Sequence, residues 1–219
     1  ASDDCQTGDL GWTSNATTDH DTDGCQDSDE DSDDDNDSVT DASDLCATGD
    51  LNWTSNLNTD YDSDGCQDSG EDLDDDNDSV IDSHDDCATG SLEWTSNSTT
   101  DHDTDGCRDS DEDTDDDNDS ISDASDNCQI GDLGWTSNSA TDHDSDGCQD
   151  SDEDTDDDND SIYDLFDDCP TGNLNWTSNS ATDHDSDGCQ DSDEDTDDDN
   201  DGADDIFDDC PTGNLNWTS

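Results

Sequence analysis

The chain has 219 residues, of which 74 are Asp or Glu and one, Arg108, is Lys or Arg, so its formal net charge is −73. Leu, Ile, Val and Phe together number nineteen, too few to bury an apolar core that offsets the entropy of ordering the backbone. This charge argues against a nucleic-acid partner, and no run of about 18 apolar residues is present to span a membrane.

Two regularities distinguish the chain from a disordered acidic tail. Its eleven cysteines, from Cys5 to Cys210, follow one another in alternating steps of 20 and 21 residues, and its tryptophans recur every 41. Regular cysteines indicate a disulfide framework and an oxidising, extracellular setting, whereas zinc sites usually carry close Cys pairs. The 41-residue period indicates a linear array of units in contact with their neighbours.

We begin each repeat at a cysteine that precedes a Trp-containing linker. The segments are then the end of a preceding repeat (1–4), five repeats (5–45, 46–86, 87–127, 128–168 and 169–209) and a partial sixth repeat (210–219). Because the sequence stops within a linker, we expect a window on a longer array. The linkers, such as ATGDLNWTSNLNT at 47–59, lack a helical apolar stripe, so we expect turns, short extended pieces and no long helix.

A first acidic loop follows each linker, at 19–30, 60–71, 101–112, 142–153 and 183–194. Its order, D-x-D-x-D-G-x5-E, has the spacing of an EF-hand calcium loop. Carboxylates at positions 1, 3, 5 and 9, the backbone carbonyl of position 7 and Glu at position 12 supply oxygens, and Gly at position 6 makes the sharp turn. The predicted metal ligands of the first loops are Asp19, Asp21, Asp23, Cys25, Asp27, Glu30, Asp60, Asp62, Asp64, Cys66, Asp68, Glu71, Asp101, Asp103, Asp105, Cys107, Asp109, Glu112, Asp142, Asp144, Asp146, Cys148, Asp150, Glu153, Asp183, Asp185, Asp187, Cys189, Asp191 and Glu194.

A second acidic loop follows each first one. The copy at 197–208, DDDNDGADDIFD, has Gly202 at position 6, and this glycine defines the register of the other copies, which have Ser there. These loops end in Asp, which is one methylene shorter than Glu, so they need help from a neighbouring carboxylate or water. The predicted ligands of the second loops are Asp33, Asp35, Asp37, Val39, Asp41, Asp44, Asp74, Asp76, Asp78, Val80, Asp82, Asp85, Asp115, Asp117, Asp119, Ile121, Asp123, Asp126, Asp156, Asp158, Asp160, Ile162, Asp164, Asp167, Asp197, Asp199, Asp201, Ala203, Asp205 and Asp208.

Acidic runs are usually solvated and disordered, but a disordered tail would not hold Gly, Asp and Glu in one register through five copies. The Ser, Thr and Asp residues on either side of each loop show no apolar periodicity, which argues against the flanking helices of an EF-hand.

The paired D-x-D-x-D-G and D-x-D-N-D-G loops, with a Cys-containing linker between them, resemble thrombospondin type 3 repeats. They are more similar still to repeats of bacterial and archaeal surface proteins whose linkers read C-P-T-G-x-L-x-W-T-S, as residues 169–178 do here. The resemblance covers the whole chain and implies calcium wrapped by backbone, with little regular secondary structure, in an extracellular protein. The chain departs from the pattern in Ser at 38, 79, 120 and 161, in Ala or Gln after the first cysteine of four linkers, and in Gly70. These departures bear on the affinities of individual loops.

We therefore expect an irregular fold, a linear rod of 41-residue repeats stapled by Ca²⁺ and disulfides. Each ion replaces the apolar cluster that the linkers cannot form, so its binding free energy becomes folding free energy. Ten filled loops, about two ions per repeat, would cancel twenty negative charges. Extracellular calcium modules bind at roughly 0.1–1 mM, so millimolar calcium would fill such sites.

We favour disulfides that close each linker: 5–25, 46–66, 87–107, 128–148 and 169–189, with Cys210 unpaired. The alternative joins Cys25 to Cys46 around a second loop. The first pattern is favoured because metal already orders the loops, whereas nothing else orders the linker. A bridge over this length stabilises by about 3 kcal/mol in the chain-entropy model.

Several other residues recur with the repeat. Each Trp is expected to lie on its disulfide or on the adjacent Leu. The residues at position 2 of the first loops, His20, Tyr61, His102, His143 and His184, are expected to face solvent. N-x-[ST] sequons occur in the linkers at Asn15, Asn52, Asn97, Asn175 and Asn216, and in the second loops at Asn36, Asn77, Asn118 and Asn159.

The expected function is structural: an extracellular or cell-surface rod, stalk or fibril. The alternative is a calcium-buffering or mineral-nucleating protein, or a spacer carrying an adhesive domain beyond these residues. We expect calcium, further copies of the chain and covalent glycans as partners. An enzyme is not expected, because a catalytic carboxylate pair needs a concave, partly desolvated site, which requires a core.

Overall fold

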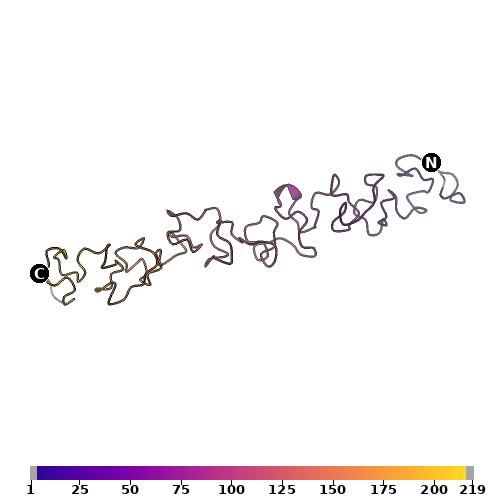
Figure 1. The fold of residues 1–219 in the computed structure, drawn as a ribbon. Coiled ribbons are helices and arrows are strands. Elements are labelled where there is room, and N and C mark those ends of the chain that lie inside the picture. The colour runs from indigo at the N-terminus through magenta and orange to yellow at the C-terminus, as the bar shows by residue number, and fades with distance from the viewer. Residues whose placement is uncertain (1–3, 216–219) are drawn as a thin grey trace. The chain divides into compact units, whose positions relative to one another are not determined.

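The computed structural model describes residues 4–215, which form bends, turns and one short helical turn. This turn, the 3₁₀ helix η1 (Asp82–His84), is the only helix among the described residues, and they include no β-strand (Figure 1). The expectation of an irregular fold with little regular secondary structure is confirmed. The chain divides into two compact units, Ala1–Asp113 and Thr114–Ser219, so the contacts given below lie within one unit or the other.

Disulfides connect the two ends of every complete linker. The bonds are Cys5–Cys25, Cys46–Cys66, Cys87–Cys107, Cys128–Cys148 and Cys169–Cys189, each over a separation of 20 residues and with Cα atoms 5.0–5.2 Å apart. The favoured pairing is therefore confirmed and the alternative around the second loop is wrong. Cys210 is unpaired and exposed.

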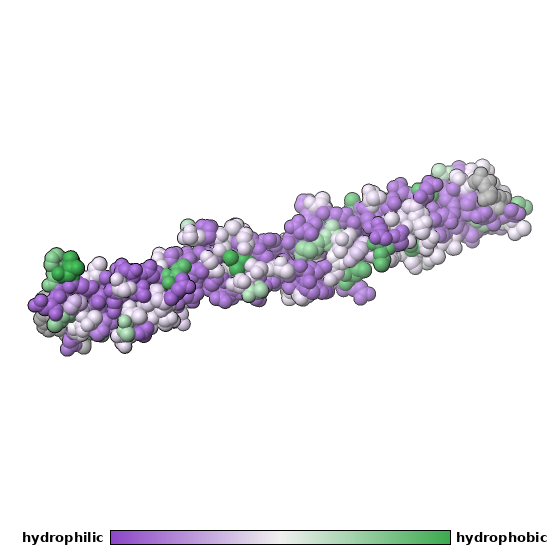
Figure 2. All heavy atoms as spheres, viewed as in Figure 1, coloured by the Kyte–Doolittle hydropathy of each residue, from purple (hydrophilic) through white to green (hydrophobic). Residues whose placement is uncertain are grey.

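The interior of each unit consists of carboxylates. The buried apolar residues are the second cysteines of the five bridges, whereas 23 aspartates of the described chain are buried. Most large apolar side chains are exposed, and Figure 2 shows them as small separate groups on a hydrophilic surface. The five described tryptophans are half-buried, Trp217 and the sequon at Asn216 lie outside the described residues, and the expected contact of each Trp with its disulfide stays a prediction.

Backbone hydrogen bonds connect each repeat to the next. The amide of Leu45, just before the second linker, donates to the carbonyl of Asp64 in the following first loop (2.8 Å). The amide of Ser55, at the end of that linker, donates to the carbonyl of Asp37 in the preceding second loop (2.9 Å). Equivalent bonds recur in both units, so neighbouring repeats hold one another in place without a sheet or a helix bundle.

The side chains at position 2 of the first loops also connect repeats, and the expectation that they face solvent is wrong. All five are half-buried. Nε2 of His20 lies 2.9 Å from the carbonyl oxygen of Gly49, and the Tyr61 hydroxyl donates to the carbonyl of Gly90 at 2.8 Å. His143 and His184 contact Gly172 and Gly213 in the same way, at 2.9 and 3.1 Å. Each partner is 29 residues further along the chain, a contact that the EF-hand template does not contain.

Replacement of His143 by Phe is expected to destabilise the junction between the fourth and fifth repeats by about 1 kcal/mol, because Phe keeps the ring but lacks a donor for the Gly172 carbonyl. His143→Tyr is the matched control and should retain the junction, because Tyr61 makes the same bond in the second repeat. Amide hydrogen exchange around Gly172 in saturating calcium measures the effect. Equal protection in the Phe and Tyr variants would show that the hydrogen bond contributes nothing.

Glycine at position 6 of the first loops is required for two separate reasons. Gly147 has a φ of 91°, and a methyl group on it would overlap the carboxylate of Asp126 from the preceding second loop. That carboxylate is held by the amide of Cys128, which donates to Asp126 Oδ1 at 2.6 Å, so it cannot turn aside without losing the bond. In the linker of the same repeat, Gly134 has a similar φ of 87° but open space around it.

Substitution of these two glycines by alanine distinguishes the cost of backbone strain, present at both positions, from the cost of overlap with a carboxylate, present only at Gly147. Gly134→Ala should cost about 1–2 kcal/mol, the usual penalty of a left-handed non-glycine residue. Gly147→Ala should cost more, and it should also weaken calcium binding at the group that contains Asp126. Thermal unfolding and calcium titration of both variants test this difference. Equal losses would show that the Asp126 carboxylate moves without cost.

Candidate metal centres

The second loops bring the carboxylates of positions 1, 3, 5 and 12 close to one another, and their role as metal ligands stays a prediction. In the second repeat, Asp76 and Asp78 are almost fully buried and Asp85 is buried beside them. A backbone amide two residues further on holds one oxygen of Asp78 and one of Asp85. Val80 N donates to Asp78 Oδ1 (2.7 Å), and Cys87 N donates to Asp85 Oδ1 (2.6 Å). The Oδ2 atoms of Asp78 and Asp85 are buried without a hydrogen-bond partner.

Burial sets the pKa values of this group. Burial raises the pKa of Asp85 to about 7, and the charges of Asp78, Asp76 and Asp74 raise it further in the same direction. Asp167, at the equivalent position of the fourth repeat, also has a pKa raised to about 7, chiefly by burial. Raised pKa values are expected when like charges share a buried site with no cation near them.

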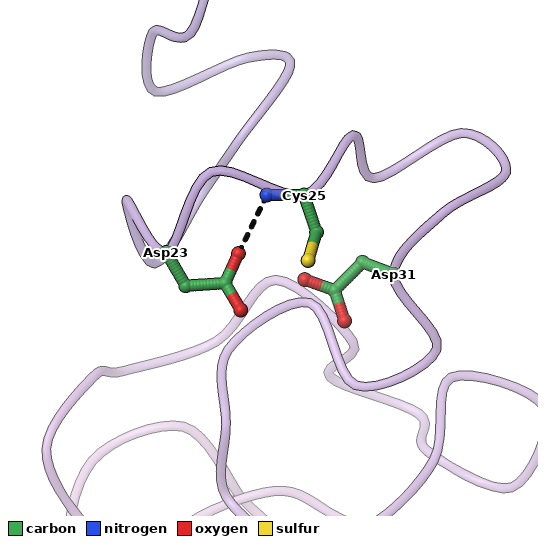
Figure 3. Close-up of side chains that lie close together, drawn as sticks. All are labelled: Asp23, Cys25 and Asp31. Carbon is green, nitrogen blue, oxygen red and sulfur yellow. Dashed lines mark hydrogen bonds between the residues drawn. The ribbon is translucent and has the colours of Figure 1, made fainter. Parts of the chain in front are cut away.

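The first loops bring together positions 1, 3 and 5, together with a residue that the sequence analysis missed. In the first repeat, one carboxylate oxygen from each of Asp19, Asp21 and Asp23 lies within 4.8 Å of the others, and Asp31 joins Asp23 (Figure 3). Asp31 follows the predicted loop at position 13. It accepts hydrogen bonds through Oδ1 from the amides of residues 32 and 33, whereas its Oδ2 is buried without a partner.

Cys25 contributes to this group through its backbone. Its amide donates to Asp23 Oδ1 at 2.8 Å (Figure 3). Its sulfur is bonded to Cys5 and is therefore not a thiolate ligand. The carbonyl oxygen at position 7 remains its predicted ligand atom.

The glutamate at position 12 of the first loop lies against the linker of its own repeat and close to the preceding second loop. Glu71 Oε1 accepts a hydrogen bond from the amide of Asp50 at 2.5 Å. A methyl group on Gly90 would lie 2.6 Å from Glu112 Oε1 and 2.9 Å from Asp76 Oδ2, so these two carboxylates flank the same glycine. Glu112 Oε2 is buried without a hydrogen-bond partner. A Glu from one repeat is thus available to the short, Asp-terminated loop of the repeat before it.

A third group of carboxylates lies between the two loops of a repeat. In the second repeat it contains Asp68 (position 9 of the first loop), Asp72 (position 13) and Asp75 (position 2 of the second loop), whose ligand oxygens lie within 4.8 Å. Burial raises the pKa of Asp75 to about 7, and the charges of Asp82, Asp68 and Asp72 add to this. Asp75 Oδ1 is buried without a partner.

Sequence reasoning missed positions 13 and 2 because the EF-hand template assigns them no ligand. A signal was present nonetheless: aspartate occupies each of these positions in all five repeats. The residues are Asp31, Asp72, Asp113, Asp154 and Asp195 at position 13, and Asp34, Asp75, Asp116, Asp157 and Asp198 at position 2 of the second loops.

An asparagine connects the two loops of a repeat. Asn77 Nδ2, at position 4 of the second loop, donates to Asp62 Oδ2 of the first loop, and also to Asp64 Oδ2 at 3.3 Å. Asn159 and Asn200 donate in the same way to Asp144 and Asp185. This neutral donor leaves the negative charge of the first-loop group uncompensated.

The buried carboxylates have no Lys or Arg partner. The only Lys or Arg of the sequence, Arg108, is paired with the exposed Asp111 through Nε at 2.6 Å and through Nη2. Burying ionised carboxylates without a counter-charge costs several kcal/mol each, so they must be protonated or bind a cation. Clusters built only from oxygen atoms suit hard divalent ions such as Ca²⁺, which takes six to eight oxygens.

No protein-family model matches the sequence, and a search of curated proteins finds no match. Within residues 4–215 there is also no helix long and apolar enough to cross a membrane. The assignment of the candidate site therefore rests on the geometry of the carboxylate groups.

Proposed function

We propose that the chain is a structural calcium-binding protein whose repeats form an extended extracellular rod, stalk or fibril. The observation that carries this proposal is the set of buried aspartates with inward oxygens that lack a partner, repeated every 41 residues. Such groups have the chemistry of a calcium site and occupy the place of an apolar core. The resemblance to thrombospondin type 3 repeats is part of this proposal and supports the same ion.

The groups suggest two or three ions per repeat. We assign one ion to each acidic loop, and the group formed by Asp68, Asp72 and Asp75 adds a third to the second repeat. The five disulfides support an oxidising environment, and millimolar extracellular calcium is sufficient for sites of the usual affinity of roughly 0.1–1 mM.

Ion stoichiometry tests the proposal directly. Native mass spectrometry and calorimetry of the oxidised chain in calcium should give about ten to fifteen ions for five repeats, bound with similar affinities. Electron microscopy should show rods in calcium that lose their shape in EDTA. Rods unchanged in EDTA would overturn the calcium fold. A larger number of weak ions, bound without any change of shape, would favour the buffering or mineral-nucleating alternative.

An exposed apolar tip in the fourth repeat supports association between copies of the chain. Leu165 and Phe166 are 85% and 70% exposed and line a cavity of about 580 Å³ with Tyr163, Asp164 and Thr155. The fifth repeat has an exposed Ile-Phe pair at the same positions, whereas the third has Ala-Ser. We propose that these exposed apolar pairs are contacts between copies of the chain.

The double variant Leu165→Ala/Phe166→Ser, which installs the residues of the third repeat, should reduce association of the calcium-loaded chain. Sedimentation velocity at several chain concentrations measures it. The matched control is Leu73→Ala, which removes an exposed side chain elsewhere and should leave association unchanged. Unaltered sedimentation of the double variant would exclude this tip as a contact between copies.

A further inference from the structure

The eight described sequons divide into three classes according to what their asparagine side chain does. In the second loops, Asn77 and Asn159 donate to first-loop carboxylates. Asn200 makes the same bond although Gly202 removes the sequon there. The structural bond therefore accounts for asparagine at this position, and a sugar on Nδ2 would displace it.

The asparagines near the ends of the linkers are also engaged. Asn97 Nδ2 donates to the carbonyl of Thr95 at 2.9 Å and to Thr100 Oγ1 at 2.8 Å, and Asn15 makes the equivalent bonds. Asn138 and Asn179 make these bonds too, although neither begins a sequon. Here again the fold explains the asparagine.

Asn52 and Asn175 form the third class. Both are exposed, stand directly before the linker Trp, and make no hydrogen bond with the rest of the described chain. Their φ values are 71° and 69°, but the same position is Gly11 or Gly134 in other repeats and Glu93, with a φ of 66°, in the third. The left-handed backbone therefore does not require asparagine, and nothing in the fold uses its amide.

We propose that Asn52 and Asn175 are N-glycosylation sites of the folded protein. Each begins an Asn-Trp-Thr sequon whose threonine, Thr54 or Thr177, is also exposed. Transfer would form a bond between Nδ2 and the anomeric carbon of a polyprenyl diphosphate-linked saccharide. Nδ2 loses one proton, and the polyprenyl diphosphate leaves with the electron pair of the broken C–O bond. The inference rests on the extracellular location in the proposed function, but not on calcium.

Glycopeptide mapping of the protein from its native source tests this assignment. Because the chain has a single Arg, cleavage before Asp is the suitable digestion, and it gives a peptide 50–59 that contains Asn52 and no other sequon. Fragmentation that preserves the sugar should place glycan mass on Asn52 and Asn175. Unmodified Asn52 and Asn175, or sugar on Asn77 or Asn97 instead, would overturn the proposal.

The variants Asn52→Gly and Asn175→Gly, expressed in the native host, provide the matched test. Glycine occupies this position in the first and fourth repeats, so the backbone conformation is preserved. Each variant should lose the mass of one glycan and keep the calcium-dependent transition of the parent. A parent protein that carries both glycans but shows no calcium-dependent transition would count against the proposed function alone. The failure of the glycosylation sites and the failure of the proposed function are therefore distinguishable.

Discussion

Chelation of divalent ions with EGTA at pH 7.5 is expected to unfold the oxidised chain, and added calcium to refold it. The physical reason is that 23 aspartates are buried, many of them in groups of like charge, while the single Arg lies at the surface. Without a cation, their mutual repulsion and desolvation exceed what five disulfides and a few half-buried tryptophans stabilise. Amide hydrogen exchange, tryptophan fluorescence and X-ray scattering should report the change together.

Calcium-saturated EGTA is the control for effects of the chelator itself and should leave the chain folded. Reduction of the disulfides in calcium is a second comparison. It should weaken the fold by about 3 kcal/mol for each bridge without abolishing ion binding to the loops. Amides that stay protected from hydrogen exchange in EGTA at pH 7.5 would contradict the proposal that calcium ions take the place of an apolar core.

The effect of pH on stability is expected to reverse sign when calcium is added. In the folded, metal-free chain, burial raises the pKa of Asp75 and Asp157 to about 7 and that of Asp34 to about 6, from an ordinary value of 3.8. A raised carboxyl pKa contributes stability that is fully present below the unfolded value and is lost as pH rises through the folded one. The metal-free chain should therefore be more stable at pH 4 than at pH 7.5.

Calcium competes with these protons, because carboxylate ligands must be ionised to bind it. With calcium present, affinity should rise between pH 5 and 7.5, by about tenfold per pH unit for each proton displaced. Chemical unfolding at a series of pH values, with and without calcium, measures both slopes. Parallel slopes under the two conditions would show that the buried carboxylates do not bind the ion.

The features that repeat locally could be predicted from the sequence. The spacing of the cysteines and the need to order the linker led to the observed bridges, and the polar linkers led to an irregular chain. The carboxylates at positions 1, 3 and 5 of each loop are alternate residues of one five-residue segment. A short sequence motif was therefore enough to predict that they lie close together. In each case the interacting residues lie within about 20 residues of one another in the sequence.

Contacts between repeats could not be predicted in this way. His20 contacts Gly49 and Tyr61 contacts Gly90 across 29 residues, and Glu112 reaches the second loop of the repeat before its own. Because every repeat has almost the same sequence, the pattern does not say which copy a side chain contacts. The third carboxylate group was missed for a related reason, since Asp72 and Asp75 meet only when two loops pack together.

The placement of the bridges determines how the chain responds to pulling. Under tension the load passes through each disulfide and bypasses the 19 residues between its two cysteines, which are 20 apart in sequence. Only the 20 residues between one bridge and the next, such as those from Cys25 to Cys46, can then extend, and they span at most about 70–75 Å at roughly 3.3–3.6 Å per residue. A stretched array would lengthen in equal steps as its second loops give way one after another, and each step would shorten again when the force is released in calcium.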